Sequence, residues 1–183
     1  MTTDQHVDQY AEERADLLEA LTKHRTLFRG TVAGLSDDQS RLTPTVSTLS
    51  LGGLVKHVAI TERAWADFVT DGPADEPDVD WDNVDWSDPP EAVVEHTQGF
   101  VMGPDETLEQ LLATYDEVAA ATDELVRTVD LAERQSLPAA PWFEPGATWA
   151  HRRTFWHVVA ETAQHAGHAD IIRETIDGQK SMG

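Results

Sequence analysis

The sequence predicts an all-α fold, a four-helix bundle, and two observations carry that prediction. Four long stretches place apolar side chains at the three- and four-residue intervals of amphipathic helices, while strand-like alternation is nearly absent. The stretches are joined by short or irregular connections, as in helical bundles. With 183 residues and 40% hydrophobic content, the chain can bury a sizeable core, so we expect a single domain, 1–183.

Two of the predicted helices lie in the amino-terminal half. The first runs from about His6 to Leu35 and stops at GLSDD. Its apolar residues, near heptad spacing, are Val7, Tyr10, Leu17, Leu21, Phe28 and Val32. The second opens after Ser50, a suitable N-cap, and ends at TDGP. Its inner face is marked by Leu54, Val58, Thr61, Trp65 and Phe68.

The other two predicted helices follow a long connection. The third begins near GPDETLEQ, where acidic residues suit the positive end of the helix dipole, and continues to about Val129. Its apolar residues include Leu108, Leu111, Leu112, Tyr115, Val118, Ala119 and Leu125. The fourth begins between Thr148 and Arg153 and ends at Gly178, a natural helix stop.

Two connections are longer than a turn. Residues 71–91 hold nine acidic residues and no basic one, which predicts an acidic irregular loop between the second and third helices. We expect Trp81 and Trp86 to hold this loop against the bundle. The segment LPAAPWFEPGATW precedes the fourth helix, and it either forms one wall of a pocket or covers the end of the core.

The charge and the composition exclude several classes of function. The chain has 13 basic and 34 acidic residues, a net charge of −21. Nucleic-acid binding depends on cations that neutralise phosphates, so we expect neither nucleic acid nor a membrane surface as partner. Without cysteine there is no disulfide, thiolate zinc site or cysteine nucleophile. No signal peptide and no apolar run of roughly 18 residues is evident, so we expect a cytoplasmic protein, with a homodimer left open.

The stretch HVVAETAQHAGH in the fourth helix carries the chemistry. At about 100° per residue, four side chains fall on one stripe of the helix: His157, Glu161, His165 and His168. Apolar residues flank the stripe, which predicts that it runs down the centre of the buried face. Arg173 falls on the far side of the wheel.

This stripe suggests a metal site. Burying a carboxylate and imidazoles costs several kcal/mol unless they are paired or bind a metal. Glu161 and His165, four residues apart, can converge on one cation, and His57 on the second helix is the natural third ligand. An internal ion pair of Glu161 with His165 is the alternative. His157 and His168 lie about a turn before and after the pair, so we expect them beside the ligands rather than among them.

Two segments also carry a family resemblance. LGGLVKHVAITERAW together with HVVAETAQHAGHADIIRETIDG resembles the DinB-like superfamily of metalloenzymes, in its mycothiol-dependent branch of maleylpyruvate isomerases and mycothiol S-transferases. The resemblance implies one divalent metal held between helices, zinc first, with nickel, iron or manganese as alternatives. Many members use three histidines, but this chain has Glu161 where one would stand. The mycothiol-dependent isomerase uses histidine, glutamate and histidine, which implies His57, Glu161 and His165 as ligands here.

The ligand set and the resemblance together predict a metal-dependent thiol transferase. Because the chain has no cysteine, the sulfur would come from a low-molecular-weight thiol, mycothiol-like by the resemblance, that attacks a small electrophile, as in detoxification. His168 or His157 would carry the proton. The isomerase has a further carboxy-terminal domain with no counterpart before Gly183, so we expect an electrophile other than maleylpyruvate.

Three other functions stay open at this level. The same ligands suit metal-assisted hydrolysis, in which the metal lowers the pKa of bound water. Two histidines and one carboxylate with open positions are also the pattern of non-haem iron enzymes. The third is a non-catalytic stress or binding protein, whose metal only ties the second helix to the fourth.

Overall fold

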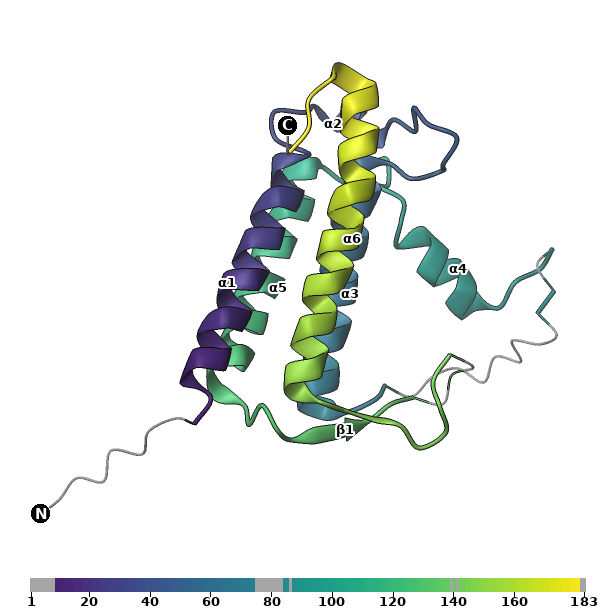
Figure 1. Ribbon diagram of the computed structural model, residues 1–183. Helices are drawn as coiled ribbons and strands as arrows, with labels where there is room; N and C mark the ends of the chain where they lie inside the picture. The colour runs from purple at the N-terminus through teal and green to yellow at the C-terminus, as the bar shows by residue number, and fades with distance from the viewer. Residues whose placement is uncertain (1–8, 75–83, 86, 139, 141, 182–183) are drawn as a thin grey trace, which may run out of the picture.

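Four long helices form the body of the protein (Figure 1): α1 (Ala11–Gly30), α3 (Leu51–Asp71), α5 (Leu108–Thr128) and α6 (His151–Asp177). This computed structural model describes residues 9–74, 84–85, 87–138, 140 and 142–181. Helices α1 and α3 each pack against both α5 and α6, which closes the four into a bundle. The predicted all-α bundle is confirmed.

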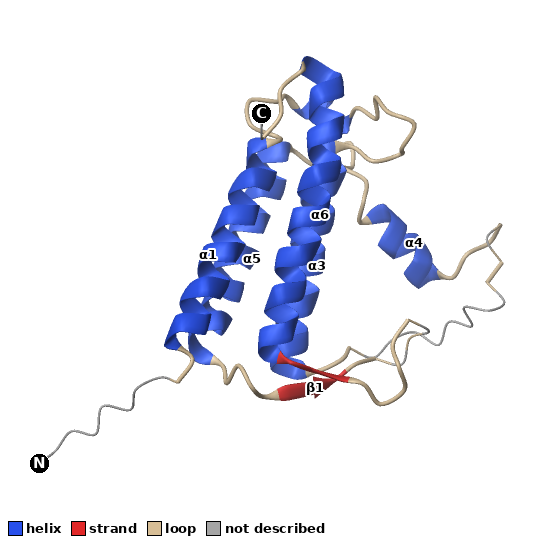
Figure 2. Cartoon of the chain, in the orientation of Figure 1, coloured by secondary structure: helices blue, strands red, loops and turns tan. Residues whose placement is uncertain are grey.

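Four smaller elements were not predicted (Figure 2): α2 (Asp37–Arg41), α4 (Glu91–Gln98), β1 (Arg134–Ser136) and β2 (Thr148–Ala150). Helix α2 lies where only a helix stop was expected. There Ser36 accepts a hydrogen bond from the backbone N–H of Gln39, and the Gln39 side chain accepts one from that of Ser36. This reciprocal cap stabilises a helix of only five residues.

Two helix boundaries could be predicted from local sequence signals alone. Helix α3 begins after Ser50, whose side chain accepts from the Gly53 N–H at 3.1 Å, and α6 ends at the left-handed Gly178. Both boundaries were predicted. Helix α1 is shorter than the predicted 6–35: it ends at Gly30, because the next N–H groups bond three residues back instead of four. Residues 6–8 lie outside the described part of the chain.

The connection between α3 and α5 is not irregular throughout, since its residues 91–98 form α4. Helix α4 stands beside the bundle, on the side of α3 and α6 (Figure 1). The prediction that Trp81 and Trp86 hold the loop against the bundle falls on residues outside the described ones. At the end of the bundle where α6 begins, β1 pairs antiparallel with β2, with Arg134 opposite Ala150.

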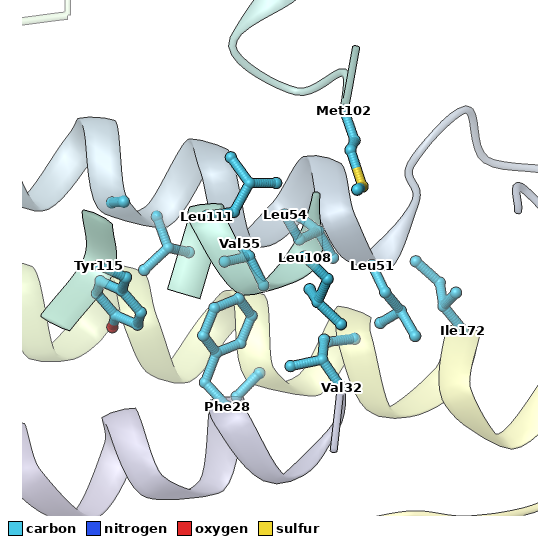
Figure 3. Close-up of a cluster of buried hydrophobic side chains, with 14 residues drawn as sticks. Phe28, Val32, Leu51, Leu54, Val55, Met102, Leu108, Leu111, Tyr115 and Ile172 are labelled. Atoms are coloured by element: carbon cyan, nitrogen blue, oxygen red, sulfur yellow. The ribbon is translucent and has the colours of Figure 1, made fainter. Parts of the chain in front are cut away.

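The core consists of two apolar clusters with charges between them. One cluster, shown in Figure 3, includes Phe28, Leu54 and Leu108, and the other includes Leu17 and Val126. Between the clusters lies what we call the ionic layer: Arg25, Glu62 and Asp123. The Nε of Arg25 donates to Glu62 at 3.2 Å and its Nη1 to Asp123 at 2.7 Å. Glu62 is 1% exposed, so this carboxylate depends on its ion pair.

Candidate metal centre

Helices α3 and α6 bring two of the predicted ligands together. His57 projects from α3 and His165 from α6, and each residue is only 8% exposed. Their ring centroids lie 4.8 Å apart, with the two planes nearly perpendicular at 76°. The contact between these helices therefore places two imidazoles side by side inside the protein.

Glu161 lies one turn before His165, at the edge of the same contact. Its Oε2 is 3.7 Å from Nε2 of His165, and its Oε1 is 3.4 Å from Nε2 of His157. The side chain is 30% exposed, so the carboxylate borders solvent while it faces imidazoles. We call His57, Glu161 and His165 the donor cluster.

Burial controls the protonation of the two buried imidazoles. It is the largest cause that lowers the pKa of His57, to about 4, with the charges of His165 and His96 adding to it. Burial also lowers the pKa of His165, with a smaller contribution from His168. Both rings are therefore neutral at pH 7, which is the form that coordinates a metal.

Two observations bear on whether a metal fits the donor cluster. Among the residues that the structure describes, no three histidine, aspartate or glutamate side chains stand in a ready-made metal-binding arrangement. Yet Nδ1 of His165 is buried and has no hydrogen-bond partner in the described part of the chain. Buried polar atoms are nearly always paired, so this nitrogen is open to a further partner, while Nε2 of the same ring faces Glu161. Two neutral imidazoles and a carboxylate suit zinc in chemistry, and the ligand assignment stays a prediction.

Two aromatic side chains near His57 were missed by the sequence analysis. The ring of Phe100 stacks on His57 at 3.6 Å and 18°, and the ring of His96, from α4, lies 6.0 Å from His57. A Cβ added to Gly53 would lie 1.9 Å from the Phe100 carbonyl oxygen. The pair Gly52–Gly53 in the first turn of α3 was the available signal, because glycine permits such a close approach of two backbones.

His157 and His168 flank the donor cluster in different surroundings. The His157 ring lies 4.8 Å from that of Trp65 and 5.0 Å from that of Trp149. Burial lowers the pKa of His157, the Glu161 charge opposes this, and Arg153 adds to the lowering. His168 is exposed, and its ring lies 5.7 Å from that of His165. One histidine is thus enclosed by tryptophans and the other is open to solvent.

Comparisons with known proteins place the chain in a family. The family model of mycothiol-S-transferase matches residues 16–178. The chain belongs to the mycothiol-S-transferase family. Membership implies a thiol substrate, and it confirms the resemblance to the mycothiol-dependent branch of the DinB-like proteins. None of the curated proteins compared with the chain matches it in sequence.

Solved structures show the same fold for this mycothiol-S-transferase family member. One match is the crystal structure of a conserved protein of locus from Enterococcus faecalis, at 15% identity and a TM-score of 0.62. The alignment covers 90% of this chain and 97% of the other. At that identity the likeness shows the fold alone. Among the described helices, none is both long and apolar enough to cross a membrane.

Within this family member, the stripe on α6 sits differently from the prediction. The stripe follows the edge of the buried face rather than its centre, because only His165 of its four residues is buried. Arg173, expected on the far side, is 3% exposed. Its Nη1 donates to the carbonyl oxygens of Thr31 at 3.0 Å and Ala33 at 2.9 Å. The guanidinium therefore satisfies carbonyls just past the end of α1, which a wheel that treats arginine as polar misses.

Proposed function

We propose that this family member is a metal-dependent S-transferase that joins a mycothiol-like small thiol to a small electrophile. One observation carries the proposal: His57 and His165, both buried and both neutral by their lowered pKa, meet between α3 and α6 beside Glu161. The family match adds the thiol. It also favours transfer over the hydrolase and iron-enzyme alternatives, which use the same ligand types.

The donor cluster would hold one divalent ion, with zinc as the first choice and nickel, iron or manganese as alternatives. When bound, the ion would supply Lewis acidity that lowers the pKa of a substrate thiol toward the physiological range. Phe100 covers one face of the His57 ring, which holds the ring in place and keeps water away from that face. Glu161 contributes negative charge and borders solvent, so its carboxylate lies on the side from which a substrate arrives.

The thiol proton must leave before sulfur attacks carbon, and two histidines can take it. Nε2 of His157 lies 3.4 Å from Oε1 of Glu161, so a protonated His157 would face a carboxylate. His168, exposed beside His165, can pass a proton directly to solvent. We propose that one of these two histidines accepts the proton, and single substitutions of each show which one it is.

The test is thiol transfer with mycothiol and with N-acetylcysteine, followed as the conjugate by mass spectrometry, with and without chelator. We expect turnover that chelation abolishes and added metal restores. His165→Ala should remove activity, whereas His24→Asn on α1 should not. Of His157→Asn and His168→Asn, the variant that loses the proton acceptor should lower kcat by about 100-fold. Turnover unchanged by chelation and by His165→Ala would overturn the proposal, and hydrolysis without a thiol conjugate would favour the hydrolase.

A further inference from the structure

A hollow opens on the side of Trp65 away from His157. It has a volume of about 240 Å³, and the rings of Trp65, Phe68, Trp142 and Phe143 form its walls. Prolines and alanines complete the lining, and no charged side chain of the described residues takes part. Three of the lining residues, at 138, 142 and 143, come from the segment before α6, so that segment forms the wall of a pocket.

Trp65 joins this cavity to the candidate centre. Its ring lies 5.4 Å from Phe68 on the cavity side and 4.8 Å from His157 on the other. Trp149 stacks on Trp65 at 5.1 Å and lies 5.7 Å from Phe143, which ties the walls together. A molecule in the cavity therefore lies against the tryptophan that contacts His157, and His157 in turn faces Glu161.

The lining of the cavity favours an apolar ligand that contains a ring. Aromatic side chains pack against aromatic guests edge-to-face or offset, and a cavity without charged groups offers little to a hydrophilic thiol. A cavity of roughly 150 Å³ holds benzene, so 240 Å³ accommodates one six-membered ring with a short chain. We propose that this cavity binds the aromatic end of the electrophile, so that the substrates are electrophiles with a single ring on a short linker. The inference rests on the proposed transferase function.

Two acrylate esters test this substrate class. Phenethyl acrylate and ethyl acrylate share one reacting group, and in the first the ring is separated from it by two saturated carbons. In both, the thiol sulfur bonds to the β-carbon and the thiol proton ends on the α-carbon, with no leaving group and no change in overall oxidation. Any preference therefore reports on binding of the ring and not on chemical reactivity.

We expect kcat/KM for phenethyl acrylate to exceed that for ethyl acrylate by about tenfold or more, because the ring is buried. Phe143→Ala should remove most of this preference, so that the ratio of the two kcat/KM values falls toward one. Phe143 belongs to neither apolar cluster of the bundle, so the variant should fold, and far-UV circular dichroism checks this. The matched control is Trp156→Ala, which removes a large ring that is 41% exposed on α6 and does not line the cavity.

A binding measurement separates this inference from the proposed function. Phenethyl propionate has no double bond to accept a thiol, so its binding by ligand-observed NMR needs no catalysis. Binding to the wild type that is lost in Phe143→Ala supports the cavity, even if neither acrylate is turned over. The lack of turnover would then count against the proposed transferase function alone. Equal binding to wild type and Phe143→Ala would overturn the inference. Equal kcat/KM for the two acrylates would do the same while leaving the transferase intact.

Discussion

The ionic layer and the donor cluster each take one residue from α3, Glu62 and His57, and they accommodate buried polar groups in opposite ways. Glu62, in the ionic layer, is 1% exposed and held by Arg25, which also bonds Asp123. Glu161, in the donor cluster, is 30% exposed and faces two imidazoles that burial keeps neutral. Where the ionic layer pairs its charges within the fold, the donor cluster leaves Nδ1 of His165 without a partner among the described residues.

This difference separates a structural role from a functional one. In a buried ion pair, each charge is already paired within the fold and is not available to a ligand. Removing one partner should therefore lower the free energy of unfolding. The donor cluster, with two neutral imidazoles and a partly exposed carboxylate, adds little to the fold by itself and has capacity for a cation.

The largest effect is expected from Glu62→Ala. Removing this carboxylate leaves Arg25 buried with only Asp123, and breaking a buried pair costs about 3–5 kcal/mol. Urea unfolding with chelator present measures the loss. Glu161→Ala is the matched control, because it deletes the partly exposed carboxylate of the donor cluster, and it should cost less than about 1 kcal/mol. Equal losses of stability in the two variants would contradict the structural role of the ionic layer.

The next effect concerns pH and His57. Burial lowers its pKa from 6.5 to about 4, so on acidification the unfolded chain takes up this proton first. The stability that the neutral ring preserves is therefore complete above about pH 6.5, and it is lost as the pH falls toward 4. We expect the stability difference between wild type and His57→Asn to shrink by on the order of 2–3 kcal/mol between pH 7 and pH 4. Chelator is present throughout, and a constant difference would contradict the burial of this imidazole.

A smaller effect tests how Phe100 is held on His57. Gly53→Ala places a Cβ 1.9 Å from the Phe100 carbonyl oxygen, so the backbone after α4 must move away from α3. Such overpacking costs about 1–3 kcal/mol, measured by thermal or urea unfolding. In Gly167→Ala, at an exposed position of α6, the new Cβ meets nothing within 4 Å, and the better helix former should add about 0.5–1 kcal/mol. Equal behaviour of the two glycines would show that Phe100 is not fixed by this approach.

No effect at all is expected with DNA. A chain with a net charge of −21 has too few cations to neutralise phosphates. Fluorescence anisotropy with a random duplex at physiological salt should show no change up to high micromolar protein. A salt-sensitive micromolar complex would show that the few basic residues gather into a binding surface.

The helices could be predicted from the sequence because their signals are local. Ser50 and Gly178 mark helix ends through their own backbone and side-chain geometry, and apolar spacing identifies the four long helices. Helix α4 was not predicted, because it is short and follows an acidic connection in which apolar residues do not recur at helical intervals. The strands β1 and β2 have three residues each, too few for alternation to show.

The residues of the donor cluster could be predicted from the sequence, whereas the residues around them could not. His57, Glu161 and His165 were selected by helical spacing, and the structure places His57 beside His165 and Glu161 beside His165. The ionic layer was not predicted, because Arg25 and Glu62 lie on different helices, 37 residues apart in the sequence. The residue pattern of one helix gives no sign of the opposite charge on the other. His96 and Phe100 were missed for the same reason, since only the path of the chain after α4 brings them to His57.

The central claim is that the donor cluster binds one divalent ion, and titration of zinc into chelator-stripped protein by calorimetry tests it most directly. We expect one ion per wild-type chain, and little or no binding to His57→Ala or His165→Ala with helical content intact. Two histidine ligands lost one at a time should each weaken the affinity by about 100-fold or more. His24→Asn should bind as wild type does. One ion bound at wild-type affinity in both His57→Ala and His165→Ala would contradict the claim.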